Sequence, residues 1–589
     1  MSSSGSRDVV YEYHDGTKHH FNAFARSLGY LDWASQPRPF REFAGSPTFA
    51  LYPAPSANAS GYSQARAAYR RLYDPGGVAA PLTAAALGDL LRHALGLSAW
   101  KQFGRSRWSL RVNPSSGNLH PTEAYVICPA LDGLADTPAV YHYAPDRHAL
   151  EQRCAFGGEA WMSEFGGPID VLLIALTSIH WREAWKYGER AFRYCQHDLG
   201  HAIAAIGFSA AIAGWRAVVL PTWSQASIAT LTGIDREEDF VEAEREEPGC
   251  IIAIAPPAAH PVTSNGSRLL EGVRNGRWRG RASQLSEDHV QWTLIDEIAR
   301  ATVDEARDNS VGRHAPSDPE GAPHSCQPES PTRISPHRGP VATATSQCTS
   351  AVGQQRTAGV ELDARAIVLQ RRSALAFDGV STLEREPFFE MLSRVVPGPE
   401  LPSGLLWWRP RIHLALFVHR VNGVAPGLYV LVRESRALER LRVACGRPFL
   451  WEPAHDVLPF ICLARGDARA LAARLSCDQD IAGDGFFSLG MIAEFTASLD
   501  DYGPSFYRKL FWETGVVGQA LYLEAEAAGA RATGIGCFYD DPVHDLLGLE
   551  GHAFQSLYHF TVGMPVEDTR LTTEPGYEWE LRRSPQPEA

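Results

Sequence analysis

Apolar residues recur at helical spacing in two long stretches of this chain, and a glycine directly follows each stretch. The first stretch covers 190–213 and precedes Gly214, and the second covers 505–528 and precedes Gly529. Apolar positions that repeat every three to four residues are typical of a helix with a buried face, and glycine is common just past a helix end. The pattern therefore predicts two long helices, one in each half of the chain.

Shorter apolar runs flank both predicted helices. Residues 169–179 and 458–466 precede the helices, and residues 250–256 and 556–565 follow them. Continuous apolar runs of this length, bounded by polar and glycine residues, are typical of buried strands. Strands interleaved with long buried helices predict an α+β fold for each half.

The two predicted helices belong to a longer internal repeat. Residues 187–233 align without a gap on residues 502–548, at a constant offset of 315 positions. The alternative, two unrelated amphipathic helices, does not explain glycine and arginine matches at one fixed offset. Two related halves on one chain predict an intramolecular pseudo-dimer, a fused version of what is otherwise a homodimer. The matched pairs include Arg193 with Arg508, Gly200 with Gly515, Gly214 with Gly529, and Arg216 with Arg531.

A change of composition divides the chain. Residues 307–359 are rich in Pro, Ser, Thr and Gly and have no apolar period. Such a segment cannot bury enough surface to offset the entropy lost on ordering, so we expect a flexible, disordered linker. The chain then consists of an N-terminal extension over 1–79, a first domain over 80–306 and a second domain over 360–589.

Composition and charge narrow the class of protein. A length of 589 residues predicts more than one core. The net charge of −13 disfavours binding to nucleic acid or to an anionic membrane. No apolar run approaches the ~20 residues that span a bilayer, and the first residues lack the apolar core of a secretory signal. The ten cysteines form neither a C-x-x-C pair nor a zinc-type spacing, so we expect reduced thiols, no metal site and a cytoplasmic protein.

Lysine is rare in this chain, and one lysine stands beside a tyrosine at the start of the first repeated helix. A lysine can exchange a proton near neutral pH, which arginine cannot. Lys186 and Tyr187 are therefore candidates for a general base, and Asp501 occupies the place of Lys186 in the second copy. The alternative is a helix-terminal residue that faces solvent. The four lysines are Lys18, Lys101, Lys186 and Lys509 among 55 basic residues.

Three other segments are candidates for ligand binding. Residues 111–123 combine small, hydroxyl and amide residues, and residues 534–536 read Gly-Ile-Gly; both let a backbone approach a ligand closely. Arg371, Arg372 and Ser373 together can grip a phosphate. Taken alone, each segment also fits an ordinary turn or a solvated surface. No complete G-x-G-x-x-G or G-x-x-x-x-G-K-[ST] motif is present, which argues against Rossmann and P-loop folds.

Together these motifs resemble the nitroreductase-like flavin oxidoreductases, and more narrowly the branch that dehydrogenates azolines in modified peptides (the SagB/ThcOx type). The resemblance covers about 80–306 and 360–570. It implies that Arg371, Arg372 and Ser373 hold the phosphate of FMN, although Leu375 replaces the last arginine of the family motif. It implies further cofactor contacts from Arg111, Pro114, Ser115, Ser116, Gly117, Asn118, Gly534, Ile535, Gly536 and Arg570, and a catalytic role for Lys186 or Tyr187.

Each half departs from the family pattern in a complementary way. The first half has the Pro-Ser-Ser-Gly loop, but 219–221 reads Val-Leu-Pro where the second half has Gly-Ile-Gly. The second half has the phosphate motif, but its own loop, 402–404, is short and poorly preserved. The resemblance therefore implies two tandem nitroreductase-like domains that share one complete FMN site, with the other site lost.

The resemblance implies a cytoplasmic FMN-dependent dehydrogenase that is reoxidised by oxygen. Its expected substrate is an azoline, or a similar activated C–C or C–N bond, in a modified peptide or small natural product. A separate cyclodehydratase is a partner that this reading allows, and further homodimerisation stays open. Two alternatives also stay open: an NAD(P)H-dependent reductase of nitro compounds, quinones or enones, and a flavin-binding scaffold without turnover.

Overall fold

The computed structural model describes residues 3–52, 67–73, 78–166, 170–257, 264–305, 351–352 and 361–581. The expected linker over 307–359 lies outside the described residues, apart from 351–352. We call residues 3–305 the first half and residues 361–581 the second half.

Strands account for the centre of each half. The strands of the first half are β1 (Phe43–Ala44), β2 (Thr48–Ala50), β3 (Leu97–Phe103), β4 (Ser106–Arg111), β5 (Thr122–Cys128), β6 (Ala139–Ala144), β7 (Ala149–Ala155), β8 (Leu172–Ser178), β9 (Arg216–Val219), β10 (Glu247–Ala255), β11 (Arg277–Trp278) and β12 (Arg281–Ala282). Then follow β13 (Ala351–Val352), β14 (Thr382–Leu383), β15 (Ile412–Val418), β16 (Gly427–Leu431), β17 (Glu452–Pro453), β18 (Phe460–Arg465), β19 (Phe487–Glu494), β20 (Arg531–Ile535), β21 (Phe554–Gly563) and β22 (Thr572–Pro575).

The helices pack around and between these strands. The first half contains α1 (Ser3–Gly16), α2 (Ala84–Ala94), α3 (Gly158–Phe165), α4 (His180–Tyr187), α5 (Ala191–Ile212), α6 (Gln225–Thr232), α7 (Ser267–Arg274) and α8 (Thr293–Ala301). The second half contains α9 (Ala364–Gln370), α10 (Arg385–Val395), α11 (Leu438–Ala444), α12 (Arg469–Leu475), α13 (Ile481–Asp484), α14 (Phe495–Tyr502), α15 (Phe506–Ala527), α16 (Asp540–Leu547) and α17 (Glu578–Leu581). Within the part of the chain that the structure describes, no helix combines the length and apolar character needed to cross a membrane.

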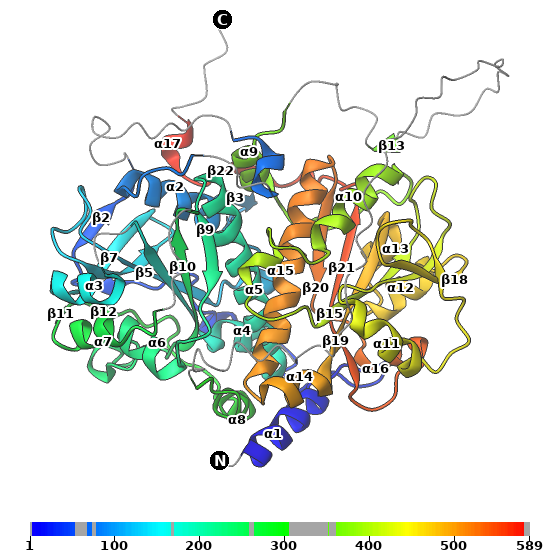
Figure 1. Ribbon diagram of the computed structural model, residues 1–589, viewed down its shortest axis with the longest axis horizontal. Helices are drawn as coiled ribbons and strands as arrows, with labels where there is room; N and C mark the ends of the chain where they lie inside the picture. The colour runs from blue at the N-terminus through cyan, green and yellow to red at the C-terminus, as the bar shows by residue number, and fades with distance from the viewer. Residues whose placement is uncertain are drawn as a thin grey trace, which may run out of the picture.

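Each half is built on one large antiparallel sheet, and the two sheets share the order of six strands, from β7 to β9 and from β18 to β20, whereas their edge strands β11 and β17 come from different places in the chain. The order is β11-β7-β6-β5-β8-β10-β9 in the first half, with β2 beside β7, and β17-β18-β16-β15-β19-β21-β20 in the second. The helices α5 and α15 lie side by side in the middle of the molecule, between the two sheets (Figure 1). The predicted α+β fold and both predicted long helices are therefore confirmed.

The internal repeat extends to the boundaries of the elements. The bounds of α14, α15 and α16 lie 315 positions beyond those of α4, α5 and α6, and β19 begins 315 positions beyond β8. One sequence assignment needs correction, because the strand before α15 that corresponds to β8 is β19 and not the 458–466 run. That run forms β18, which pairs with β16. The sequence of β19, FSLGMIAE, contains Ser, Gly and Glu, so it lacks the continuous apolar run that is typical of a buried strand.

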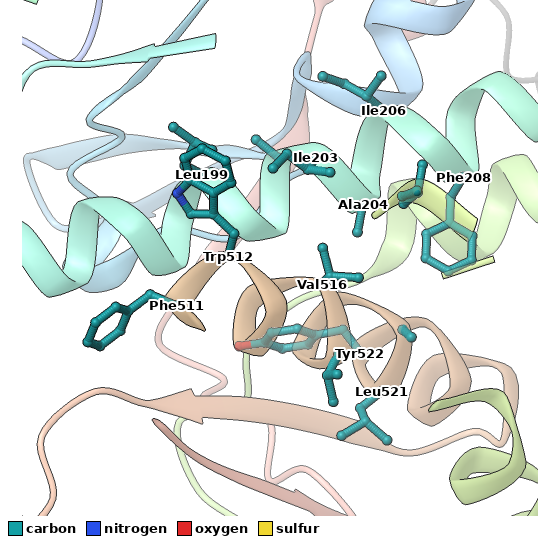
Figure 2. Close-up of a cluster of buried hydrophobic side chains, with 14 of the residues drawn as sticks. Leu199, Ile203, Ala204, Ile206, Phe208, Phe511, Trp512, Val516, Leu521 and Tyr522 are labelled. Atoms are coloured by element: carbon teal, nitrogen blue, oxygen red, sulfur yellow. The ribbon is translucent and has the colours of Figure 1, made fainter. Parts of the chain in front are cut away.

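The two long helices cross at glycines that the repeat had matched. A Cβ atom on Gly200 would lie 2.3 Å from the carbonyl oxygen of Trp512, and one on Gly515 would lie 2.3 Å from that of His197. Any side chain at these positions would push the helices apart, because buried helix contacts leave no free volume. Figure 2 shows apolar side chains around this crossing, among them Leu199, Ile203, Ala204, Trp512 and Val516.

A buried ion-pair cluster also joins the halves. Asp540, the first residue of α16, accepts hydrogen bonds of 2.9 Å from both Arg190 and Arg193. Burial alone would raise the pKa of Asp540, but the two guanidinium groups hold it well below its usual range. Arg193 and its repeat counterpart Arg508 also donate hydrogen bonds to residues at the ends of α1 and α8, respectively. The matched arginines therefore fix the ends of two helices, α1 and α8, which lie next to each other (Figure 1).

The ends of the chain are exchanged between the halves. Helix α1 packs on the second half, where His14 Nε2 lies 2.9 Å from Gln555 Oε1. At the other end, β22 pairs with β3 of the first half, and Glu580 of α17 forms an ion pair with Arg92. Figure 1 shows α1 beside α14, and β22 beside β3 on the opposite face of the molecule. Each half thus completes its surface with a segment from the far end of the chain.

Candidate functional site

A cavity of about 460 Å³ lies between the two halves. The first half contributes β3, β4, the loop before β5, and α5, while the second half contributes the segment after α9, β20, and the segment between β21 and β22. The structure brings most of the predicted cofactor residues to this one cavity. The predicted residues on its wall are Arg111, Pro114, Ser115, Ser116, Gly117, Asn118, Tyr187, Arg371, Arg372, Ser373, Gly534, Ile535 and Gly536.

The Pro-Ser-Ser-Gly loop is anchored from below by α5. The backbone N–H and the hydroxyl of Ser116 each donate a hydrogen bond of 2.9 Å to Asp198 Oδ1. The hydroxyl of Ser115 accepts a 2.7 Å hydrogen bond from the N–H of His120. These bonds turn the loop back on itself and present its backbone to the cavity.

Gly117 allows Lys186 and Tyr187 to lie against this loop. Its φ is +59°, in the left-handed region that favours glycine. A Cβ atom there would lie 2.6 Å from Tyr187 Oη and 3.2 Å from Lys186 Nζ. Lys186 is not itself a wall residue, but its Nζ lies beside Gly117 at the edge of the cavity.

The opposite wall is made by the Gly-Ile-Gly strand end. A Cβ atom on Gly534 would lie 1.9 Å from Tyr558 Oη, and one on Gly536 would lie 2.2 Å from the ring of Tyr194. Both glycines are therefore required by close packing against tyrosines. The N–H of Gly534 donates a 2.9 Å hydrogen bond to Tyr522 Oη, which fixes the backbone of this strand end at the cavity.

Arg371 and Arg372 reach across from the second half to the first. Arg371 donates to the carbonyl oxygen of Val112 at 3.0 Å, and Arg372 donates to that of Ser98 at 2.9 Å. Burial lowers the pKa of both guanidinium groups, in Arg372 to about 10. Arg371 Nη1 and Arg372 Nε are buried and have no hydrogen-bond partner among the described residues. A buried cationic donor without a partner is costly, which favours an anionic ligand here.

Two further basic residues gather at the same end, and sequence reasoning had not assigned them. Lys101 and Arg531 line the cavity, and burial, Arg372 and Arg531 together lower the pKa of Lys101. Only the rarity of lysine pointed toward Lys101. Its position depends on the pairing of β3 with β4 and β22, which no local pattern reveals.

Arg570 requires a correction, because it is not on the cavity wall. Its guanidinium group turns to Asp568, with Nε and Nη2 donating hydrogen bonds of 2.8 and 2.7 Å. The side chain is exposed. The carboxylate of Asp568, two residues away, is a bidentate partner, and this local pairing holds the Arg570 side chain away from the cavity.

Two buried acids lie under the loop and were also missed. Burial raises the pKa of Asp198 to about 7, against the opposing hydrogen bonds from Ser115 and Ser116. Burial, reinforced by Asp198, raises the pKa of Glu183 well above its usual value. Neither carboxylate oxygen of Glu183 has a hydrogen-bond partner among the described residues. The floor of the site thus holds two carboxyl groups that stay protonated at pH values where a carboxyl group in water is ionised.

We expect Asp198→Asn to change how stability depends on pH. Folding raises the pKa of Asp198, so between about pH 4 and 7 the folded protein keeps a proton that the unfolded chain releases. The free energy of unfolding of the wild type therefore falls as the pH rises through this window, by up to ~1.4 kcal/mol per pH unit. The variant lacks this titration. Its thermal midpoint should therefore fall less than that of the wild type between about pH 5 and 8.

The exposed Glu297→Gln is the matched control for Asp198→Asn and should follow the wild type. An equal fall in the midpoint of Asp198→Asn and wild type over this range would show that Asp198 does not titrate there.

The internal repeat relates this cavity to a second position in the molecule, and side chains fill that second position. Glu513 stands 315 positions after Asp198, and it accepts hydrogen bonds from Trp408 Nε1 at 3.1 Å and from the N–H of Arg411 at 3.0 Å. Trp408 is 5% exposed. The acid that anchors a ligand-facing loop in the first half thus anchors a buried tryptophan in the second.

Comparison with known proteins yields matches to nitroreductases. Residues 428–564 match the sequence model of the nitroreductase family. A candidate nitroreductase of Methanocaldococcus jannaschii is 28% identical over 126 residues, which cover 20% of this chain and 59% of that relative. The match therefore spans less than two thirds of the relative's length.

Solved structures extend the likeness to the whole chain. A candidate nitroreductase from Anabaena variabilis has 20% identity and a TM-score of 0.64, and the match covers 95% of this chain and 99% of that one. A candidate nitroreductase from Ralstonia eutropha has 19% identity and a TM-score of 0.24, over 40% of this chain and 98% of its own. The first of these structures shows that the chain has a nitroreductase-like α+β fold along nearly all of its length.

Proposed function

We propose that this chain is an FMN-dependent oxidoreductase made of two tandem nitroreductase-like domains, which form an intramolecular pseudo-dimer and share one cofactor site. The observation that carries the proposal is the cavity itself. Its loop wall comes from the first half, and its glycine wall and the paired arginines that we propose to bind the phosphate come from the second. Neither half alone has the complete set.

The residues of the cavity fit FMN in size and chemistry. A volume of about 460 Å³ lies within the usual range for cofactor pockets. The unpartnered donors of Arg371 and Arg372 suit a phosphate dianion. Lys101 and Arg531 add two basic groups to the wall, of which Arg531 pairs with Glu567 at 2.6 Å. Gly534 and Gly536 leave a backbone face that suits a flat ring.

The protein's own residues would bind, orient and handle protons. When bound, the flavin supplies the two-electron redox chemistry. Lys186 Nζ is exposed at the cavity edge and has no carboxylate within ion-pair distance among the described residues, which suits a group that takes a proton from substrate. Burial, together with Glu183, raises the pKa of Tyr187, so its hydroxyl keeps its proton. This hydroxyl would orient the substrate by donating a hydrogen bond to it. Asp198 positions the loop.

We propose that the substrate is an azoline, or a similar activated C–C or C–N bond, in a modified peptide or small natural product. The position of Lys186 supports this direction, since removal of hydrogen from carbon requires a base near the redox centre. The chain would then act after a separate cyclodehydratase. The NAD(P)H-dependent reductase is the competing assignment, and rapid bleaching of the bound flavin by NADPH under anaerobic conditions would favour it.

We expect the purified protein to carry about one FMN per chain, because Trp408 and its neighbours fill the repeat-related place. The measurement is the flavin released on denaturation, divided by the protein concentration from amino-acid analysis. A ratio near two would show that the second place also binds a cofactor. A protein that neither contains nor takes up FMN would contradict the proposed function.

A further inference from the structure

Cys477 and Cys537 form a thiol pair at the wall of the cavity. Cys537 lines the cavity directly after Gly536, and its Sγ lies 2.9 Å from Cys477 Sγ. Both residues are partly exposed, whereas the other described cysteines are buried. Burial raises the pKa of the Cys128 and Cys154 thiols to about 12, which makes them inert. The pair is separated by 60 positions, so no C-x-x-C pattern revealed it.

Hydrogen bonds hold the two cysteine loops together. Gln479 Nε2 donates to the carbonyl oxygen of Ser476 at 2.7 Å and to that of Cys537 at 3.0 Å, so one amide bridges both loops. Cys477 itself has a φ of +55°, in the left-handed region that side chains rarely adopt. The two sulfur atoms therefore face each other because the surrounding structure fixes them.

The surroundings of Cys537 favour its thiolate. The hydrogen bond with Cys477 lowers the pKa of Cys537 to about 5, helped by His19 and Arg190 and opposed by burial. His19 Nδ1 accepts a 2.9 Å hydrogen bond from the N–H of Ala25, which leaves Nε2 as the nitrogen that donates to the sulfur. Cys537 also lines the cavity, whereas Cys477 lies behind it, so we assign Cys537 as the attacking thiol and Cys477 as the resolving thiol.

We propose that Cys537 and Cys477 form a thiol–disulfide exchange site for low-molecular-weight disulfides that enter the cavity. The Cys537 thiolate attacks one sulfur of a disulfide R–S–S–R, which forms Cys537–S–S–R and releases RS⁻. The released thiolate takes the proton of Cys477, whose sulfur then attacks the Cys537 sulfur and expels the second RS⁻. Two protein thiols are oxidised to one disulfide, and the small disulfide is reduced to two thiols, so no other oxidant is needed.

The proposal is tested on the full-length, fully reduced protein with oxidised glutathione as the probe. Samples are quenched by alkylation at intervals, and the cysteines are assigned by peptide mass mapping. We expect a Cys477–Cys537 cross-link to form before any of the six buried cysteines of the described residues is modified. The proposal is overturned if both cysteines remain alkylated throughout, or if glutathione adducts accumulate without the cross-link.

Single substitutions separate the two steps. In Cys477→Ser, the second step is lost, so one glutathionyl group should accumulate on Cys537. In Cys537→Ser, Cys477 should lose its reactivity toward oxidised glutathione. Cys445→Ser, at a buried cysteine, is the matched control and should cross-link as the wild type does. An unmodified Cys537 in Cys477→Ser would also overturn the proposal. None of these readouts requires bound FMN, so they stand or fall independently of the proposed function.

Discussion

Replacing Arg371 and Arg372 together by alanine is expected to weaken FMN binding by about 10²–10⁴-fold. Each hydrogen bond to a charged partner contributes ~1.5–3 kcal/mol, and ~1.4 kcal/mol corresponds to a factor of ten. The buried guanidinium groups have donor atoms without partners among the described residues, so a phosphate would use them fully. Binding is measured by the quenching of FMN fluorescence as apoprotein is added.

Two controls make this experiment decisive. Arg570→Ala removes an arginine that the family resemblance placed at the phosphate but that the structure pairs with Asp568, and it should bind FMN as the wild type does. Arg371→Lys keeps the charge and tests the loss of bidentate geometry alone. Because Arg371 and Arg372 also bond to backbone of the first half, circular dichroism must show that the double variant is folded. Unchanged FMN affinity in a folded double variant would place the phosphate elsewhere.

Lys186→Ala is expected to retain FMN and to lose about 10²–10⁴-fold in turnover, the usual contribution of a general base. The reason is its position, with Nζ at the edge of the cavity beside Gly117. Lys186→Arg is the sharper variant, because arginine keeps the charge but does not release its proton near neutral pH. If Lys186 takes a proton from substrate, the arginine variant should be nearly as inactive as the alanine variant.

The measurement is the rate of flavin reduction by substrate in single turnover, which is independent of reoxidation. Tyr187→Phe should have a smaller effect, since its raised pKa keeps the hydroxyl protonated. Arg442→Ala, at an exposed basic residue, is the control for removal of a positive charge and should turn over as the wild type does. Lys509→Ala would not serve, because Lys509 forms a buried ion pair with Asp304. Recovery of most of the rate in Lys186→Arg would limit Lys186 to holding an anionic substrate.

Local and repeated patterns predicted a large part of this fold. The long helices were readable because their apolar period and terminal glycines are properties of one segment. The fixed offset of the repeat also pointed to a tertiary contact, since Gly200 and Gly515 are the positions where the two long helices touch. In contrast, β19 was missed because its burial comes from neighbours on both edges rather than from an apolar sequence.

The candidate site was predictable where chemistry resided in a contiguous motif. The Pro-Ser-Ser-Gly loop, the paired arginines and the Gly-Ile-Gly all lie on the cavity wall. Lys101, Asp198 and Cys477 were not foreseen, because their roles depend on which distant segments the fold brings together. Arg570 was placed incorrectly because a motif cannot show that a nearby carboxylate captures the side chain.

The pairing of β22 with β3 makes protection of a cavity-wall strand a late event in biosynthesis. Strand β3 carries Lys101 of the wall, and β22, which ends at Pro575, pairs with one of its edges. A ribosome must therefore translate residues 572–575 before this edge is protected, and until then the nascent first half exposes an open strand edge that favours aggregation. A chain that stops before β22 would leave the backbone of Lys101 and Gln102 unpaired along this edge.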